Sequence, residues 1–231
     1  MMLEIIATSL EDAIAAERAG ADRLELCAAL TEGGLTPSLG LVEAVVQGVD
    51  IPVHVIVRPH SRTFQYDEKD LAVMLSDIRY IKQAGAAGIV IGVLDEENKV
   101  NTEVLSRLLL EAGEMNITFH RAFDEIEDQL KALEVIATFP QIQRILTSGG
   151  QAPAPEAAEQ LKKLVDKSKN TSVRILAGNG MSPETLVPLV TATGLEEVHF
   201  GSAVRVNRSF MHPVDEAVIA DVKSNLQRLG E

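Results

Sequence analysis

Short runs of apolar, often β-branched residues alternate with longer helical stretches about eight times along this chain. Such runs predict buried strands, and the stretches between them predict helices that lead from one parallel strand to the next. Strands are expected at Leu3–Ile6, Arg23–Leu26, Val53–Val57, Gly88–Ile91, Ile117–Phe119, Arg144–Leu146, Val173–Ala177 and Val198–Phe200. Helices are expected at Ser9–Ala19, Ser38–Val46, Glu68–Ala84, Thr102–Ala112, Ile126–Ala137, Glu156–Lys167, Pro183–Thr193 and Val214–Leu229.

This alternation predicts a (β/α)8 TIM-like barrel that occupies residues 1–231 as a single domain. Eight units in 231 residues leave roughly 29 residues for each, the size of a compact parallel barrel. The similar segments 19–22 and 84–87 each place a glycine between a helix and a strand, as a left-handed helix cap requires. Alternation alone does not prove closure, so an open, doubly wound sheet is the alternative fold.

Composition restricts the partners of the chain. It has 21 basic and 34 acidic side chains, and its net charge of −13 opposes binding to nucleic acid or to an anionic membrane. The single cysteine excludes an intramolecular disulfide, and no basic-plus-apolar leader or long apolar span is present. We therefore expect a cytoplasmic protein whose partner is a small anionic ligand or a metal ion.

Polar side chains occupy strand positions that should face the barrel interior. Because residues two apart on a strand share a face, Glu25 lies on the same face as Cys27, and Arg58 on the same face as His54. Glu25, Arg58 and His120 all fall at or near the carboxyl ends of strands, where barrels hold their active sites. We expect these three to surround the mouth. Internal Glu–Arg pairs and a buried core histidine at His54 are the structural alternative.

The segment 117–124 joins a strand to a helix and carries His120, Arg121 and Asp124. If the chain is an enzyme, we expect Glu25 or His120 to be a general acid or base and Asp124 to orient a neighbouring group. Arg58 and Arg121 then hold an anionic group of the substrate. Alternatively, Arg121 and Asp124 form a local ion pair that fixes the loop.

The loops after the last three predicted strands are rich in glycine and small polar residues. Glycine lets backbone N–H groups approach an anion closely, and barrels often hold phosphate in the last two of these loops. Tight turns alone also require glycine, so both interpretations stay open. The candidate substrate-binding residues are Thr147, Ser148, Gly178, Asn179, Gly180, Gly201 and Ser202.

Several of these segments together resemble the CutC family of copper homeostasis proteins. They are 25–27, 33–38, 57–59, 88–94, 118–124 and 146–149, and the blocks ELC, GGLTPS and TFHRAFD are long enough to be specific. The resemblance implies a TIM-like barrel, a cytoplasmic location, a homodimer and a link to copper. It does not imply a defined molecular activity.

Two functions remain open at this point. Cu(I) prefers clustered sulfur ligands, and this chain offers Cys27 with scattered methionines, so copper binding should be weak and depend on Cys27, with His120 and Glu25 as further ligands. Cys27 as a small loop residue is the alternative. The other function is a lyase or isomerase acting on a small phosphorylated or carboxylated metabolite. No lysine stands at a predicted strand end, which disfavours Schiff-base chemistry. The residues leave open whether the chain is an enzyme.

Overall fold

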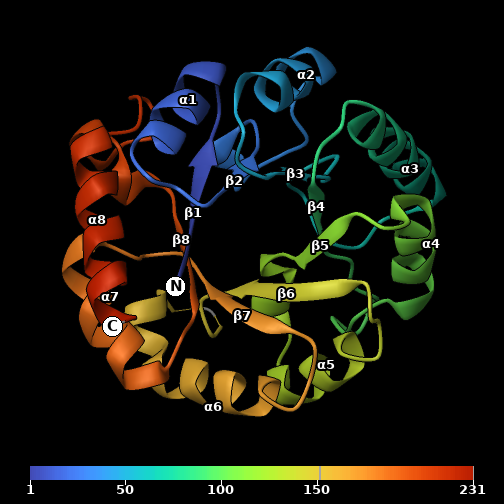
Figure 1. Ribbon diagram of the computed structural model, residues 1–231. Helices are drawn as coiled ribbons and strands as arrows, with labels where there is room; N and C mark the ends of the chain where they lie inside the picture. Colours follow the sequence, from blue (N-terminus) through green and yellow to red (C-terminus); the bar gives the residue numbers. More distant parts are fainter. Residues whose placement is uncertain (151, 231) are drawn as a thin grey trace.

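The computed structural model describes residues 1–150 and 152–230, and its strands form a closed parallel barrel. Each strand pairs with the next along the chain, and the last pairs with the first, with Leu3 opposite Val198. Figure 1 shows the ring of strands surrounded by the helices. The predicted (β/α)8 barrel is confirmed, and the open sheet is excluded because no strand edge is left unpaired.

The strands lie within one or two residues of their predicted positions. The largest difference is at the sixth strand, which begins at Ile142 rather than Arg144 because Ile142 pairs with Ile117 across a bulge. At this bulge the Gln143 side-chain oxygen accepts the Ile117 N–H at 2.6 Å. The strands are β1 Met2–Ala7, β2 Arg23–Leu26, β3 Val53–Ile56, β4 Gly88–Ile91, β5 Asn116–Phe119, β6 Ile142–Thr147, β7 Arg174–Ala177 and β8 Glu197–Phe200.

The helices also follow the prediction, and all except the sixth begin with a polar side-chain cap. The fifth helix is shorter than predicted because a 3-10 turn, Arg121–Glu125, follows β5, and the helix begins after Asp128, whose carboxylate accepts the Lys131 N–H. The helices are α1 Leu10–Arg18, α2 Leu39–Gly48, α3 Glu68–Gln83, α4 Thr102–Ala112, α5 Gln129–Ile136, α6 Ala158–Ser168, α7 Pro183–Thr193 and α8 Glu216–Leu229.

The main apolar core lies between the strands and the surrounding helices. In β4, Ile89 and Ile91 belong to this core, while Val90 belongs to a small apolar group inside the barrel. Both faces of each strand are therefore covered, which explains why the strands read as continuous apolar runs. The inner group also contains Ile6, Cys27 and Ile56.

Inside the barrel, buried ions pair with one another. Arg23 contacts Glu4 and lies 2.8 Å from Glu197 through its Nη2 atom. Arg144 Nε lies 3.1 Å from the same Glu197 carboxylate. Two guanidinium groups and two carboxylates thus balance in charge, and removing any one would leave a net charge buried among the others.

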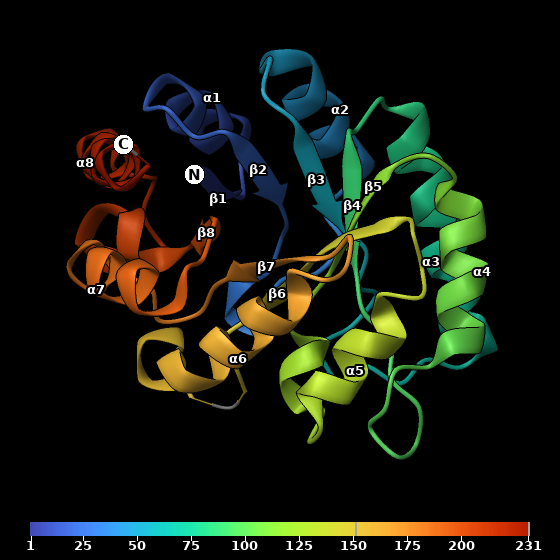
Figure 2. The ribbon, with the colours of Figure 1, turned by 60° about the horizontal axis from the view of Figure 1, so that its bottom comes forward.

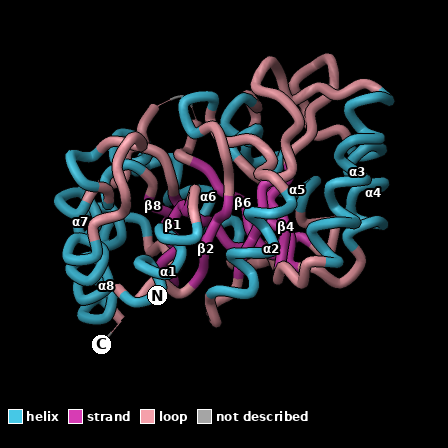
Figure 3. The backbone as a smooth tube through the Cα atoms, turned by 90° about the horizontal axis from the view of Figure 1, so that it is seen from above, coloured by secondary structure: helices cyan, strands magenta, loops and turns pink. Residues whose placement is uncertain are grey.

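The loops that follow the strands gather at one end of the barrel. In the side view of Figure 3, long loops rise at the end away from the N-terminus. In Figure 2 the arrowheads of β2 and β3 mark the carboxyl ends of these strands, from which such loops continue. No helix in the described part of the chain is both long enough and apolar enough to span a membrane.

Candidate functional site at the barrel mouth

A pocket of about 480 Å³ opens at the carboxyl ends of the strands, a volume suited to a small molecule. The structure brings the five residues predicted as catalytic to its wall, from the loops or ends of β2, β3 and β5. Those residues are Glu25, Arg58, His120, Arg121 and Asp124. Their chemical roles depend on the contacts that each one makes.

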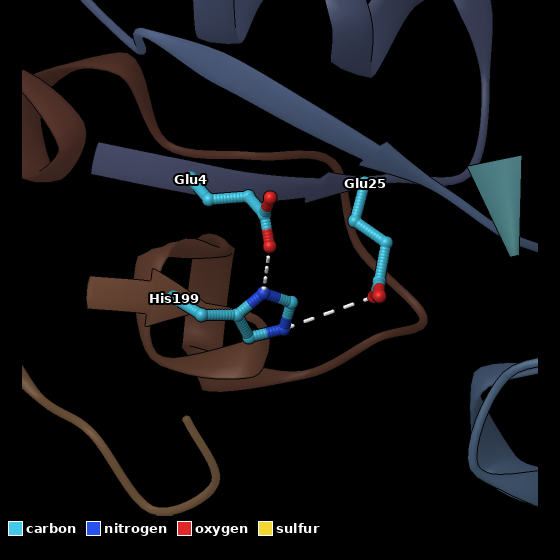
Figure 4. A group of neighbouring side chains, drawn as sticks. All are labelled: Glu4, Glu25 and His199. Carbon is cyan, nitrogen blue, oxygen red and sulfur yellow. Dashed lines mark hydrogen bonds and ion pairs between the residues drawn. The ribbon is translucent and has the colours of Figure 1, made fainter. Parts of the chain in front are cut away.

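Glu25 belongs to a cluster of two carboxylates and one imidazole (Figure 4). His199 Nδ1 lies 2.7 Å from Glu4 Oε1, and His199 Nε2 lies 3.8 Å from Glu25 Oε2. One potential ligand atom from each of the three residues lies within 4.8 Å of the others. Glu4 therefore fixes the ring so that its second nitrogen faces Glu25, the arrangement by which carboxylates orient metal-binding histidines.

The three groups of this cluster differ in protonation. Burial raises the pKa of Glu25 to about 7 because it disfavours the ionised carboxylate. Burial also acts on Glu4, but the charge of Arg23 and the hydrogen bond with His199 hold its pKa well below the usual range. Although burial opposes protonation of His199, the charges of Glu25 and Glu4 raise its pKa. Glu25 and His199 thus act on each other: the charge of His199 lowers the pKa of Glu25 against the effect of burial, and the charge of Glu25 raises that of His199.

His120 has a defined tautomer. Its Nδ1 accepts the Ala122 N–H at 3.1 Å, so in the neutral ring the proton must be on Nε2. Burial, together with the nearby charge of Arg58, lowers the pKa of His120 to about 3 and keeps the ring neutral. Its Nε2 is buried and has no hydrogen-bond partner among the described residues.

Arg58 fastens two loops through its two Nη atoms. Its Nη1 donates to the carbonyl oxygens of Glu32 at 3.1 Å and Gly34 at 3.2 Å, and its Nη2 to that of Ser61 at 3.4 Å. Its buried Nε has no partner within the described part of the chain. The ring of Phe64 lies 4.6 Å from the Arg58 guanidinium carbon, so the cation is also stabilised by an aromatic face.

Asp124 connects the loops after β5 and β6. Its carboxylate accepts the Arg121 Nε–H at 2.8 Å, the Ser148 N–H at 3.1 Å and the hydroxyl groups of Ser148 and Thr147. The local ion pair considered from the sequence is therefore present. Thr147 and Ser148 are fully buried beside this carboxylate and do not line the pocket.

Packing accounts for the glycines of the last two loops. A Cβ atom at Gly178 would lie 2.7 Å from Leu146 Cδ1, and one at Gly180 would lie 2.5 Å from Pro153 Cβ. Gly180 also has a φ angle of +75°, which glycine adopts without strain. Of the predicted substrate-binding residues in these loops, Asn179, Gly180, Gly201 and Ser202 line the pocket and Gly178 does not.

Cys27 lies in the apolar group inside the barrel, fully buried beside Ile6, Ile56 and Val90. Burial and then the charge of Glu25 raise the pKa of its thiol well above the usual value. The protonated thiol is not the form that binds metal ions. Cys27 is not part of the pocket wall, nor of the cluster of metal-binding atoms found among the described residues.

Two members of the cluster, Glu4 and His199, were not among the predicted site residues. Both lie within strands, β1 and β8, and both are buried. They could have been predicted from one feature of the sequence, a charged or titratable residue at an inward position of an otherwise apolar strand. For His199 the pattern is clear, because Glu197 and Gly201 share its face.

Comparisons with known proteins agree with this architecture. A protein from Thermotoga maritima, phosphoribosyl anthranilate isomerase, has a TM-score of 0.66 and 12% identity over 99% of both chains, which shows a shared fold alone. A CutC protein from Streptococcus agalactiae has a TM-score of 0.82 and 30% identity, covering 87% of this chain and 98% of that one.

Curated sequences give the same relationship. The human copper homeostasis protein cutC homolog is 39% identical over 198 residues, covering 86% of this chain and 72% of the relative. The family protein CutC of Pasteurella multocida is 38% identical over 213 residues, covering 92% of this chain and 86% of the relative. The CutC family model matches residues 1–204, and this chain therefore belongs to the CutC family.

Proposed function

We propose that this protein acts in copper homeostasis by holding one copper ion weakly, as Cu(II), at the barrel mouth. The observation that carries the proposal is the His199 imidazole, which Glu4 orients toward the Glu25 carboxylate. A relative bears the name copper homeostasis protein, which supports copper as the ion.

The donor atoms fit Cu(II) better than Cu(I). Imidazole nitrogen and carboxylate oxygen suit Cu(II), whereas Cu(I) prefers thiolate and thioether sulfur. Glu4 already contacts Arg23 and His199, so we assign it to orienting the ring. His199 Nε2 and Glu25 are then the two protein ligands, and water fills the other positions. Two ligands explain why the binding should be weak and the ion exchangeable.

A titration of metal-free protein with Cu(II) tests this assignment. We expect one equivalent to bind in competition with a weak chelator such as glycine, with nitrogen coupling from one imidazole in the electron paramagnetic resonance spectrum. His199→Gln should abolish this signal. His212→Gln is the matched control, because His212 is exposed near the same end of the chain and outside the cluster.

Cys27→Ser separates this site from the one expected from the sequence. Since the thiol is buried apart from the pocket wall, the substitution should leave Cu(II) binding unchanged. Loss of copper with Cys27→Ser, or retention with His199→Gln, would contradict the assignment.

The relatives do not favour a lyase or isomerase. The cytoplasmic location and the homodimer stay predictions, the latter open to sedimentation analysis.

A further inference from the structure

The pocket is larger and more apolar than a copper ion requires. Its volume of about 480 Å³ lies within the range of sites for organic ligands. Leu146, Met181 and Phe210 contribute apolar side chains to its wall, and Phe64 adds an aromatic ring. Such a wall suits an organic molecule with an apolar body.

One region of this wall is rich in unused N–H donors. His120 carries its proton on Nε2, which has no hydrogen-bond partner among the residues described, and the same holds for Arg58 Nε. An unpaired buried donor is costly, so each of these groups gains from an acceptor. Arg121 lies at the same region, and its side chain is 43% exposed.

Phe64 packs against both residues that carry these donors. Its ring centre lies 5.0 Å from that of His120, and Arg58 lies against the same ring at 4.6 Å. Phe64 is itself only partly buried, on the loop between β3 and α3. The Phe64 ring is therefore the part of the pocket wall that contacts both of the residues with unpaired donors.

The charges of the wall select the kind of anion. Arg58 and Arg121 share the wall with the carboxylates of Glu32, Asp124 and Glu125, and Asp124 already pairs with Arg121. These carboxylates offset much of the positive charge of the two guanidinium groups, so the wall matches a single negative charge better than the two charges of a phosphate ester. A planar carboxylate also matches the forked donors of arginine.

We propose that the pocket binds a small organic acid with one carboxylate and an apolar body. The carboxylate lies between Arg121 and the Nε2–H of His120, and the body packs among Phe64, Met181 and Phe210. The ligand needs no metal ion, so this inference goes beyond the copper proposal and stands or falls separately from it.

Benzoate titrated into protein kept metal-free by a chelator tests the inference, with heteronuclear NMR as the readout. Benzoate should bind at least about tenfold more tightly than benzamide, its neutral isostere, since a hydrogen bond to a charged group is worth more than a neutral one. Inorganic phosphate at the same concentration should not displace it. Arg121→Gln should weaken benzoate binding by about tenfold or more.

Arg62→Gln is the matched control and should leave benzoate binding unchanged, because Arg62 is exposed and outside the pocket wall. The His120 ring gives a second readout without any substitution. In the free wild-type protein its nitrogen shifts should identify the Nε2–H tautomer, and benzoate should shift that proton. Any one of five results would overturn the proposal. Three concern binding: benzamide binds as tightly as benzoate, phosphate displaces benzoate, or benzoate does not bind up to its solubility. The other two are an Arg121→Gln variant that binds benzoate as tightly as the wild type does, and a His120 ring that carries its proton on Nδ1.

Discussion

Glu25→Gln removes a buried charge from the site without changing its shape. The pKa of Glu25 is raised from 4.5 to about 7 because burial disfavours the ionised form. At about 1.4 kcal/mol for each pH unit, this difference amounts to about 3 kcal/mol. Glutamine resembles the protonated carboxyl group in size and carries no charge, so it does not incur this cost at any pH.

The sign follows from proton uptake. Between pH 4.5 and about 7 the folded protein binds this proton more tightly than the unfolded chain does, so the free energy of unfolding of the wild type falls as the pH rises. At pH 8 the variant should be more stable by about 3 kcal/mol, which corresponds to a Tm higher by about 6–12 °C in a protein of this size. At pH 4.5 the two proteins should melt close together.

Circular-dichroism melts at both pH values, with a chelator present, measure this difference. Glu43→Gln is the control, because Glu43 is exposed on α2 and its replacement should change Tm little at either pH. A variant that is less stable than the wild type at pH 8, or that gains equally at both pH values, would refute the reasoning. In the copper titration the same variant should lose affinity, since it lacks a proposed ligand.

Three further substitutions test other parts of the structure. Asp12→Ala should cost about 3–5 kcal/mol in urea unfolding at pH 7, because it leaves the buried Arg205 without its carboxylate. Arg205 lowers the pKa of Asp12, against the effect of burial, so this loss should shrink as the pH falls below 3.8. Gly92→Ala should cost about 1–3 kcal/mol and displace His120, visible in the ring nitrogen shifts, since the added Cβ would lie 2.2 Å from Nδ1. Arg23→Met should lower Tm strongly, as two buried carboxylates lose their shared cation.

The fold could be predicted from the sequence because its signals are local. Buried parallel strands leave apolar runs, and glycines such as Gly20 and Gly85, both with positive φ, mark helix ends. The start of α5 could not be placed in this way. The apolar Ile126 resembles a helical position, but the preceding 3-10 turn is held by Asp124, whose partners on β6 and its loop are distant in sequence.

The candidate site could be predicted only where it coincides with strand ends. Arg58 and His120 were expected at the mouth because they directly follow predicted strands, and both line the pocket there. Glu4 and His199 were missed because the contact between them depends on closure of the barrel, which brings β1 beside β8. The inward position of Cys27 followed from strand parity, but its burial among Ile6, Ile56 and Val90, apart from the pocket wall, depends on how the inward side chains of neighbouring strands fill the space.

Through Glu4, residues outside the pocket wall can influence the His199 ring. Glu4 contacts His199 with one carboxylate oxygen and Arg23 with the other, and Arg23 is shared with Glu197. A substitution such as Glu197→Gln, which touches no ligand, would give Glu4 a larger share of the guanidinium charge and make the His199 ring a weaker base. Laboratory evolution could thus change the metal affinity of the site, or the acidity of the His199 ring, through substitutions beneath the pocket. The residues that contact the ligand would stay the same.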